Sequence, residues 1–443
     1  MTDGSVSADV VAWARGQLAA GLPAAVLERT RLHVADSAGI AIAAARTSDL
    51  ARAVARAIGE GTEGTGLYLG PDSAHAFGNG ALIHLLDYDD VYDPGHVHLS
   101  AATLPAALCA AAETAAQGPA VPVVDAVALG NELVCRLGDV AALTSPTSNW
   151  FLTQLFGYFG ATLAYGLTAG LSDAELTSAL GLAYMQAAGG KEAAFGVGGT
   201  ARAVYPGFAA RGGVDAGRLA RAGITGPARV FEGAAGLFRI YLGSPLTADG
   251  AALLTGSGWR LLDAEVKRWP CCRISHPYVA GVLDRGRLPG DPLAAAVTIR
   301  VDARSRPLCE PPAQRANPAT LQDAKYSVPF LVALGLVHGD VGLATLDRPV
   351  LDDVLVQKVA ATVRIEDLPA GPDEPLVVVD GVGHGRRDDF GPGELWRTVE
   401  TKFVADIGFA GGTPDGARAL FDALLTDDAD VRSVLAGWRV DGS

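Results

Sequence analysis

The sequence is poor in charged residues and has no surplus of positive charge. Charged residues make up 19% of its 443 positions, against a usual value of about 25%. The 35 Lys and Arg residues face 49 Asp and Glu residues, which gives a formal net charge of -14. The missing basic surplus argues against a nucleic-acid partner, because Lys and Arg are what neutralise phosphates. The 49% of hydrophobic residues excludes a largely disordered chain.

Cysteines are few and irregularly spaced along the chain: Cys109, Cys135, Cys271, Cys272 and Cys309. An odd number without regular spacing argues against a disulfide framework. No CxxC pair is present, so the sequence supports neither a zinc ribbon nor a ferredoxin-type cluster. Residues 1–18 lack the basic and then apolar pattern of a signal peptide. We therefore expect a cytoplasmic protein.

One long stretch, from Val140 to Ser172, has no charged residue at all. Its segment from Trp150 to Leu171 is long enough to span a bilayer. However, the segment contains polar residues, has no basic flank and stands alone in the chain. A helix buried on all sides in a large helical domain explains it better, so we expect no membrane partner.

The texture of the sequence changes near residue 260. Before it, Ala and Leu recur at helical spacings, and Gly or Pro separates the segments. After it, residues 295–301, 361–365 and 376–379 are rich in β-branched residues and predict strands. We therefore predict a mostly α protein with a large all-helical domain (1–261 with 401–443) and a smaller α+β domain (262–400).

Histidines and aspartates gather between residues 75 and 98. This window holds His75, His84, His96 and His98, which are four of the eight histidines, together with Asp87, Asp89, Asp90 and Asp93. Its second half contains Pro94 and Gly95, which predict a loop after a helix. Imidazoles and carboxylates beside one substrate are suited to general acid–base catalysis, because histidine titrates near neutrality.

Two other interpretations of this window stay open. The first is a solvated acidic loop whose aspartates cap helices. The second is the DDxxD magnesium motif of isoprenoid synthases, which Asp89 to Asp93 match. Pro94 disfavours that motif because it would break the helix that such a site needs, and we find no second acidic motif.

A second cluster lies between residues 267 and 277. Lys267, Arg268 and Arg273 stand here with His276 in a charge-poor chain. Ser275 is expected to cap a following helix, which places His276 at a helix N-terminus that favours an anion. Arg273 could bind a carboxylate in a bidentate manner. The alternative is a charged strand end with a capped helix.

A third patch contributes polar groups to an otherwise apolar helix, at Lys325, Tyr326 and Ser327.

Taken together, these pieces resemble the MmgE/PrpD family. The resemblance covers nearly the whole chain in order, through Asn79-Gly80, His84, Asp87–Asp90, His98, Leu104–Ala107, Phe156–Gly160, Tyr205–Ala210, Gly223–Pro227, Glu232-Gly233, Pro270–Arg273, His276-Pro277 and Ala324–Ser327. The family includes 2-methylcitrate dehydratase, cis-aconitate decarboxylase and an iminodisuccinate epimerase. The resemblance implies a large helical domain, an α+β lid domain, a cleft between them, homodimers and chemistry without a metal or other cofactor.

The resemblance also implies site residues. Expected catalytic residues are Asp87, His98, His276 and, electrostatically, Lys267; expected substrate-binding residues are His96, Arg202, Tyr205, Arg273, Lys325 and Ser327. Two positions depart from the family pattern. Val91 stands where decarboxylating members have a threonine, and Arg202 stands where many members have a lysine.

We therefore expect a cofactor-independent lyase that abstracts a proton next to a carboxylate or carbonyl of a small carboxylate substrate. Dehydration of a citrate-like acid comes first among the expected reactions. Decarboxylation of a cis-aconitate-like acid, epimerisation or another isomerisation, and a specialised-metabolite reaction are the alternatives. A binding protein that keeps the fold without catalysis is a hypothesis of a different class.

Overall fold

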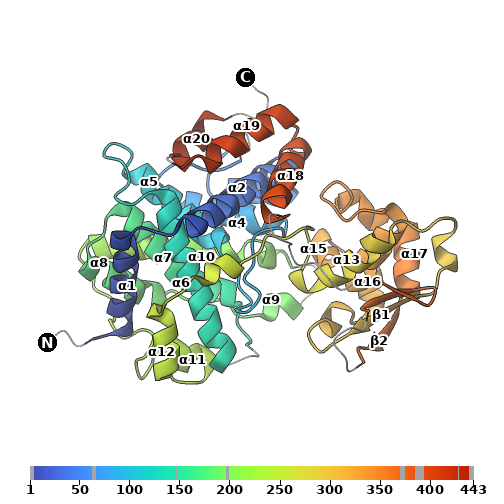
Figure 1. The fold of residues 1–443 in the computed structure, drawn as a ribbon, viewed down its shortest axis with the longest axis horizontal. Helices are drawn as coiled ribbons and strands as arrows, with labels where there is room; N and C mark the ends of the chain where they lie inside the picture. The colour runs from blue at the N-terminus through green and yellow to red at the C-terminus, as the bar shows by residue number, and fades with distance from the viewer. Residues whose placement is uncertain are drawn as a thin grey trace. The chain divides into compact units, whose positions relative to one another are not determined.

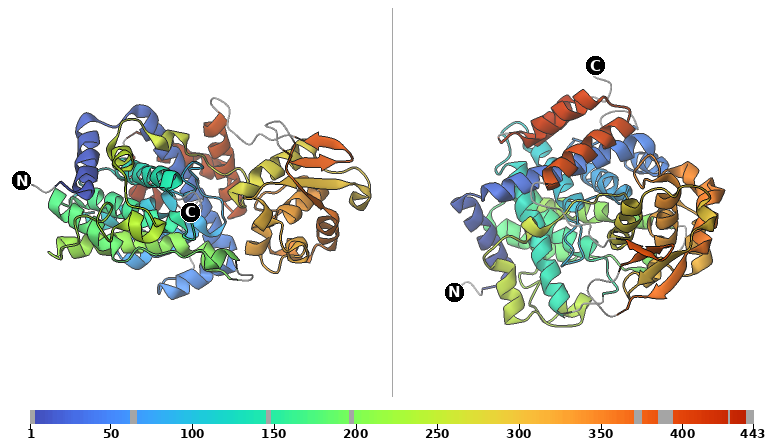
Figure 2. Two further views of the ribbon diagram at one scale, coloured as in Figure 1. Left: turned by 90° about the horizontal axis from the view of Figure 1, so that it is seen from below. Right: turned by 45° about the vertical axis from the view of Figure 1, so that its right-hand side comes forward.

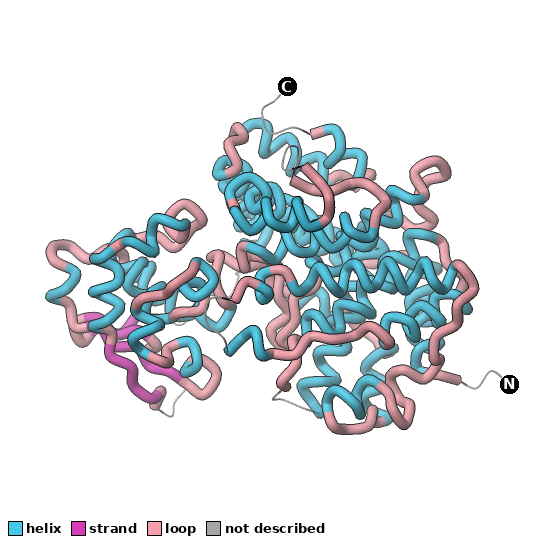
Figure 3. Tube along the Cα trace, turned by 180° about the vertical axis from the view of Figure 1, so that it is seen from behind, coloured by secondary structure: helices cyan, strands magenta, loops and turns pink. Residues whose placement is uncertain are grey.

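The computed structural model describes residues 4–61, 66–144, 148–195, 199–369, 375–384, 394–427 and 429–438. The chain divides into two compact units. Unit 1 comprises Met1–Phe195, Ala201–Val266 and Trp396–Ser443, and unit 2 comprises Gly196–Thr200 and Lys267–Leu395. Unit 1 is helical, and unit 2 combines helices with one small sheet (Figures 1 and 3). This confirms the predicted fold class, a mostly α protein with a smaller α+β part.

Unit 1 is built from helices that follow one another with short connections. They are α1 (Val6–Ala20), α2 (Ala24–Thr47), α3 (Asp49–Ala57), α4 (Ser73–Leu85), α5 (Ser100–Glu113), α6 (Val123–Thr144), α7 (Leu152–Ala169), α8 (Asp173–Tyr184), α9 (Glu192–Phe195), η1 (Ala201–Ala203), α10 (Tyr205–Arg221), α11 (Leu237–Leu242), α12 (Ala248–Thr255) and η2 (Arg260–Asp263). The chain returns from unit 2 through α18 (Glu394–Phe409), followed by α19 (Pro414–Leu425) and α20 (Val431–Gly437). Of these last helices, coloured red, α19 packs against the blue α2 and α20 contacts α5 (Figures 1 and 2).

Most of the uncharged segment from Trp150 to Leu171 forms α7, which is the central helix of unit 1. It packs against α5, α6 and α10, and all but its first residue are buried. Small residues allow this close packing: a Cβ added at Gly160 would lie 2.5 Å from Val134 Cγ2 and 2.8 Å from the carbonyl oxygen of Gly130. The buried-helix interpretation is therefore confirmed.

Among the described residues, no single helix is both long and apolar enough to cross a membrane. One pair of helices, α1 with α2, meets that test jointly across a bend of 107°.

Unit 2 carries a four-stranded mixed sheet with strand order β2-β1-β3-β4. Its strands are β1 (Val297–Val301), β2 (Arg364–Asp367), β3 (Val377–Val379) and β4 (Val382–His384). β1 pairs parallel with β2 and antiparallel with β3, which pairs antiparallel with β4. Its helices are η3 (Arg273–Ser275), α13 (His276–Arg285), η4 (Pro292–Ala294), η5 (Arg306–Leu308), α14 (Pro312–Ala316), α15 (Leu321–Lys325), α16 (Val328–His338), η6 (Arg348–Asp352) and α17 (Val354–Thr362).

Two of the strands differ from the prediction. β2 begins at Arg364, later than predicted, because α17 continues through Thr362. β4 was not predicted, although the sequence contains its signal. Asp380 and Gly381 link β3 to β4 with φ values of 50° and 81°, and an Asp-Gly pair is the usual choice for a hairpin turn with two positive φ angles.

Candidate functional site

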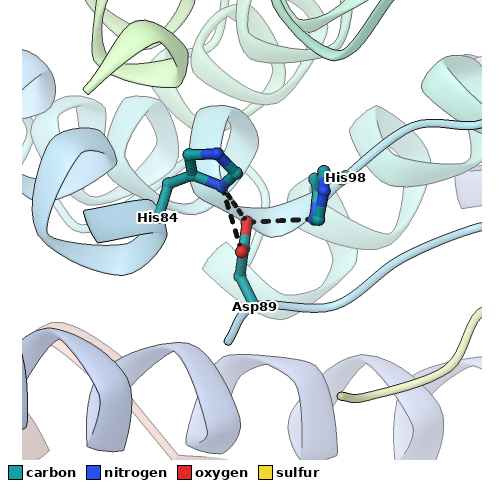
Figure 4. A group of neighbouring side chains, drawn as sticks. All are labelled: His84, Asp89 and His98. Carbon is teal, nitrogen blue, oxygen red and sulfur yellow. Dashed lines mark hydrogen bonds and ion pairs between the residues drawn. The ribbon is translucent and has the colours of Figure 1, made fainter. Parts of the chain in front are cut away.

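A histidine–aspartate–histidine cluster lies at the end of α4 in unit 1 (Figure 4). His84 Nδ1 is 3.0 and 2.9 Å from the two carboxylate oxygens of Asp89. His98 Nδ1 is 3.3 Å from Asp89 Oδ2, and the two imidazole rings meet edge to face at 4.9 Å between centroids. We call these residues the His84–Asp89–His98 cluster.

The backbone of the connecting loop is fixed from both sides. Asp87 follows α4 with a φ of 54°, in the left-handed region that few non-glycine residues adopt. Three residues later, Asp90 accepts hydrogen bonds from the backbone N–H groups of Leu99 and Ser100, each at 3.1 Å. α5 has no side-chain cap of its own at Leu99, so Asp90 caps α5 from the loop.

Asp90 has further partners. The Ser100 hydroxyl donates to it at 2.5 Å, and His33 Nδ1 lies 3.0 Å from it. Burial raises the pKa of the Asp90 carboxyl, but the hydrogen bond and charge of His33 and the bond from Ser100 outweigh burial and leave that pKa lowered.

This capping network makes a stability prediction for Asp90→Asn. The lowered pKa means that the ionised carboxylate stabilises the fold above the unfolded value near 3.8, and that this stabilisation is lost as the pH falls through the folded pKa. We expect the substitution to cost about 2 to 3 kcal/mol at pH 7. Melting temperatures measured from pH 7 down to pH 3 check this. The difference between wild type and variant should shrink in acid, and a constant difference would contradict the assignment.

The electrostatics of the cluster keep Asp89 ionised. Burial raises the pKa of the Asp89 carboxyl, but the charges and hydrogen bonds of His84 and His98 outweigh burial and hold it well below its ordinary value. Burial lowers the pKa of His84, although Asp89 and, more weakly, Asp87 act in the opposite direction. The cluster therefore offers one ionised carboxylate to two imidazoles.

His98 differs from its neighbours in access to solvent. Its side chain is 15% exposed, whereas His84 is 2% exposed and Asp89 is fully buried. Its Nδ1 donates to the Asp90 carbonyl at 2.8 Å, and its backbone N–H donates to Thr153 Oγ1 at 2.9 Å. These contacts fix the tautomer, with the proton on Nδ1, and the orientation of the ring.

Two aromatic rings, those of Tyr205 and Phe151, lie between the cluster and the Arg202 guanidinium. The Tyr205 ring meets the His84 ring at 4.8 Å and stacks on Phe151 at 4.6 Å with 9° between the planes. The Arg202 guanidinium lies 5.9 Å from the centre of the Phe151 ring. Burial raises the pKa of Tyr205 above its ordinary range, so the phenol stays protonated. Burial and the charge of Arg202 lower the pKa of Lys191, which lies nearby.

The other two site residues predicted in this loop, Asp87 and His96, differ in their exposure to solvent. Asp87 is buried, and its charge acts on both His84 and Tyr205. His96 lies at an exposed turn, where its Nδ1 donates to the Asp93 carbonyl at 2.6 Å. Of the two neighbouring histidines, His98 is therefore the one that joins the cluster.

The cluster also raises the question of a metal. Among the described residues, His84, Asp89 and His98 form the one group of three potential metal ligands whose donor atoms lie within 4.8 Å of one another. Two imidazoles and a carboxylate suit zinc chemically. However, both Nδ1 atoms already face the carboxylate at distances of 2.9 to 3.3 Å, which hydrogen bonds account for. Asp89 and Asp90 bind different partners, so the pair does not present the joint carboxylates of a DDxxD magnesium site.

The basic segment of unit 2 is largely buried. Lys267 is 1% exposed and His276 is fully buried. Arg273 Nη1 lies 3.5 Å from His276 Nδ1, and the Trp269 ring meets the His276 ring at 5.2 Å. Arg268 forms an ion pair with Glu394 at 3.2 Å. The prediction that His276 lies at a helix N-terminus is confirmed, because α13 begins at His276.

The predicted side-chain cap at Ser275 is wrong. Ser275 occupies the N-cap position of α13, but its hydroxyl makes no capping bond. Its φ of -80° and ψ of -17° are helical, because η3 leads directly into α13. A capping side chain needs an extended backbone to reach back to the first N–H groups.

The third predicted patch lies beside this segment within unit 2. The Lys325 carbonyl accepts a hydrogen bond from the Cys272 N–H at 3.0 Å, and Lys325 itself is 4% exposed. Ser327 caps α16, accepting from the Phe330 N–H at 3.2 Å and donating to the Arg315 carbonyl at 2.5 Å. The Ser327 hydroxyl thus forms hydrogen bonds within unit 2. Its contact with a substrate stays a prediction.

The set of expected site residues did not include His84 or Asp89. Both stand in the dense window, but the resemblance directs attention to Asp87. The sequence offers only a partial signal, a histidine five residues before an aspartate across a helix end, because the turn between them appears only in the structure. A helix that ends at Leu85 and a loop that turns back after Asp87 bring a histidine and an aspartate five residues apart into contact.

Comparisons with known proteins identify the family to which this chain is similar. The family model of the MmgE/PrpD N-terminal domain matches residues 8–249, and the family model of the MmgE/PrpD C-terminal domain matches residues 269–374. Cis-aconitate decarboxylase of Aspergillus terreus is 28% identical over 306 residues, which cover 64% of this chain and 61% of that protein. The human cis-aconitate decarboxylase is 27% identical over 315 residues, covering 67% and 62%.

A third relative is matched over a longer region. The cis-aconitate decarboxylase-like protein oryM of Aspergillus oryzae is 26% identical over 375 residues, covering 79% of this chain and 77% of that protein. The chain spans less than two thirds of the length of the A. terreus relative. The N-terminal model alone matches more than half of the 443 residues, and with the resemblance in motif order this leads to one conclusion: the chain belongs to the MmgE/PrpD family.

Proposed function

We propose that the protein is a lyase that releases carbon dioxide from a small unsaturated polycarboxylate of the cis-aconitate type. The observation that carries the proposal is the solvent-accessible His98, held with His84 on one buried, ionised carboxylate. The names of the relatives support decarboxylation over the dehydration that the sequence put first.

The reaction needs one proton delivered to carbon. In a cis-aconitate-like acid, the bond between a methylene carbon and its carboxylate breaks, and its electron pair forms a new double bond. The old double bond then places its electrons on the carbon next to another carboxylate, which takes up the proton. The balance is one proton consumed and one carbon dioxide released. Catalysis requires a positioned acid and cations that stabilise the enolate-like charge.

His98 supplies the acid in this proposal. Its Nδ1 faces the Asp90 carbonyl and the Asp89 carboxylate, so Nε2 is the nitrogen that exchanges a proton with the substrate. The ionised Asp89 stabilises the imidazolium form of His98 before transfer. Asp87 adds a second negative charge close to the cluster.

Cations hold the carboxylates of the substrate. We assign this role to Arg202, Lys267 and Arg273, as the family resemblance implies. A guanidinium binds a carboxylate through two parallel hydrogen bonds, which suits the half-buried Arg273. His276 and Lys325 are proposed to act with them.

The proposal predicts a binding defect for Arg273→Met. The loss of a charge-assisted, bidentate contact is expected to raise KM by roughly 10- to 100-fold. Steady-state kinetics over a wide substrate range measure this, with Arg304→Met as a matched control on an exposed arginine of unit 2. An unchanged KM would remove Arg273 from the binding groups.

Dehydration of a citrate-like acid is the second candidate, and Val91 favours it. This residue stands where decarboxylating members of the family have a threonine, and it is buried and pairs with Glu265 through its backbone. In this reaction His98 removes a proton from carbon instead of donating one to it, and the imidazolium then returns that proton to the leaving hydroxyl, which departs as water.

A panel of acids distinguishes the candidates. Wild-type protein is incubated with cis-aconitate, citrate and 2-methylcitrate, while carbon dioxide and the organic products are quantified. Carbon dioxide release supports the first candidate, and loss of water without it supports the second. Saturable binding without any turnover would instead support a protein that keeps the fold but not the catalysis.

A further inference from the structure

Lys402 is a buried cation behind the loop that carries Asp89. It lies on α18 and is 5% exposed. Its Nζ is 2.7 Å from Asp36 Oδ1 on α2, and it donates to the Tyr88 carbonyl at 2.7 Å. It also lies 3.7 Å from the centre of the Tyr88 ring.

Two buried carboxyl groups accompany this one ammonium. Asp406 lies one turn after Lys402 on α18, and both Asp36 and Asp406 are buried. Burial raises the pKa of Asp36 to about 6, against the opposing effect of Lys402, and raises the pKa of Asp406 well above its ordinary value. Asp36 is therefore the carboxylate in contact with the ammonium, and burial favours the protonated form of Asp406.

Stability alone does not explain such a group. A buried ion pair often contributes no more to stability than well-packed apolar residues of similar volume. The feature that an apolar side chain cannot replace is the hydrogen bond to the Tyr88 carbonyl.

The Tyr88 carbonyl lies in the part of the loop that sets the position of Asp89. Tyr88 stands between Asp87, whose φ is 54°, and Asp89, whose carboxylate holds both imidazoles. A non-glycine residue in the left-handed region persists only where its surroundings hold it. Asp90 anchors the far side of the loop to α5, and Lys402 anchors the near side to α18.

We propose that Lys402 is a positioning residue for the His84–Asp89–His98 cluster, through its hydrogen bond to the Tyr88 carbonyl. Helix α18 is thereby part of the machinery that orients Asp89 and His98. The kinetic consequence rests on the proposed function, while the structural consequence does not.

The structural consequence is measured by NMR on protein labelled with 15N-histidine. The Nδ1–H protons of His84 and His98 are expected far downfield because each is hydrogen-bonded to a buried acceptor. His84→Gln and His98→Gln assign the two signals. In Lys402→Met we expect both signals to shift or to broaden through exchange with solvent.

Companion variants separate the hydrogen bond from charge and stability. Lys402→Met with Asp36→Asn removes the ammonium without leaving a buried carboxylate unbalanced, and is expected to show the same shifts. Asp36→Asn alone keeps the ammonium on the Tyr88 carbonyl and is expected to shift the signals less. Leu420→Ala, at a buried position of α19, is expected to lower stability and to leave the signals in place.

The kinetic consequence is a fall in kcat of about 10- to 100-fold for Lys402→Met with little change in KM, because a displaced catalytic group loses rate rather than binding. Signals and kcat that stay at wild-type values in the double variant would overturn the proposal. If wild-type protein turns over none of the acids, the proposed function fails, and the NMR signals still decide the role of Lys402.

Discussion

Replacing His98 by Gln is expected to lower kcat by about 10²- to 10⁴-fold, the usual contribution of a positioned acid or base. Glutamine keeps a polar side chain of similar reach but cannot exchange a proton near neutral pH. KM should change much less, because the carboxylates of the substrate are assigned to arginine and lysine side chains.

A matched control for His98→Gln comes from the same stretch of sequence. His75 on α4 pairs with Glu60 at 2.7 Å and is not in contact with Asp89 in the described cluster. His75→Gln should retain kcat within about twofold, as ordinary surface substitutions do. Equal losses in the two variants would mean that His98 supports the fold and not the chemistry.

Asp89→Asn is expected to lower kcat by up to about 10⁴-fold, the cost known for an aspartate that orients a catalytic imidazole. The amide keeps the shape of the side chain but loses its charge, and it cannot accept protons from His84 and His98 on both sides equally. The imidazolium form of His98 then loses its nearest counter-charge.

The pH dependence gives Asp89→Asn a second readout. Burial lowers the pKa of His84 and Asp89 partly offsets that effect; the ionised carboxylate favours the protonated form of His98 in the same way. Without it, both imidazoles hold their protons less strongly, so the limb of the kcat profile that reports His98 should move to lower pH. A profile that keeps its position while kcat falls would contradict an electrostatic role and leave only an effect on packing.

Periodicity and composition predicted the parts of the fold that depend on local sequence. The uncharged α7 was recognisable because a helix without charges is best accommodated in a core. Ser172 and Glu175 also have the spacing of a capping box, and the structure contains it: the Ser172 side chain accepts from the Glu175 N–H, and the Glu175 side chain accepts from the Ser172 N–H. The predicted side-chain cap at Ser275 was wrong because the backbone of Ser275 belongs to the preceding helical turn, which the sequence does not reveal.

The candidate site was only partly predictable, for a physical reason. His98 stands in a dense run of histidines and aspartates, so its residue type and neighbourhood were informative. The contact between His84 and Asp89 depends on a left-handed residue at Asp87, a conformation that the sequence does not specify there. Lys402 lies 314 positions from Tyr88, and only the folded chain brings them together.

The most direct test of proton transfer through His98 is a turnover experiment in D₂O. Wild-type protein is incubated with cis-aconitate, and carbon dioxide is measured together with the deuterium content of the product. We predict one deuterium on the carbon next to a carboxylate for each carbon dioxide released, and loss of both signals in His98→Gln. Carbon dioxide released by His98→Gln at the wild-type rate would contradict the account.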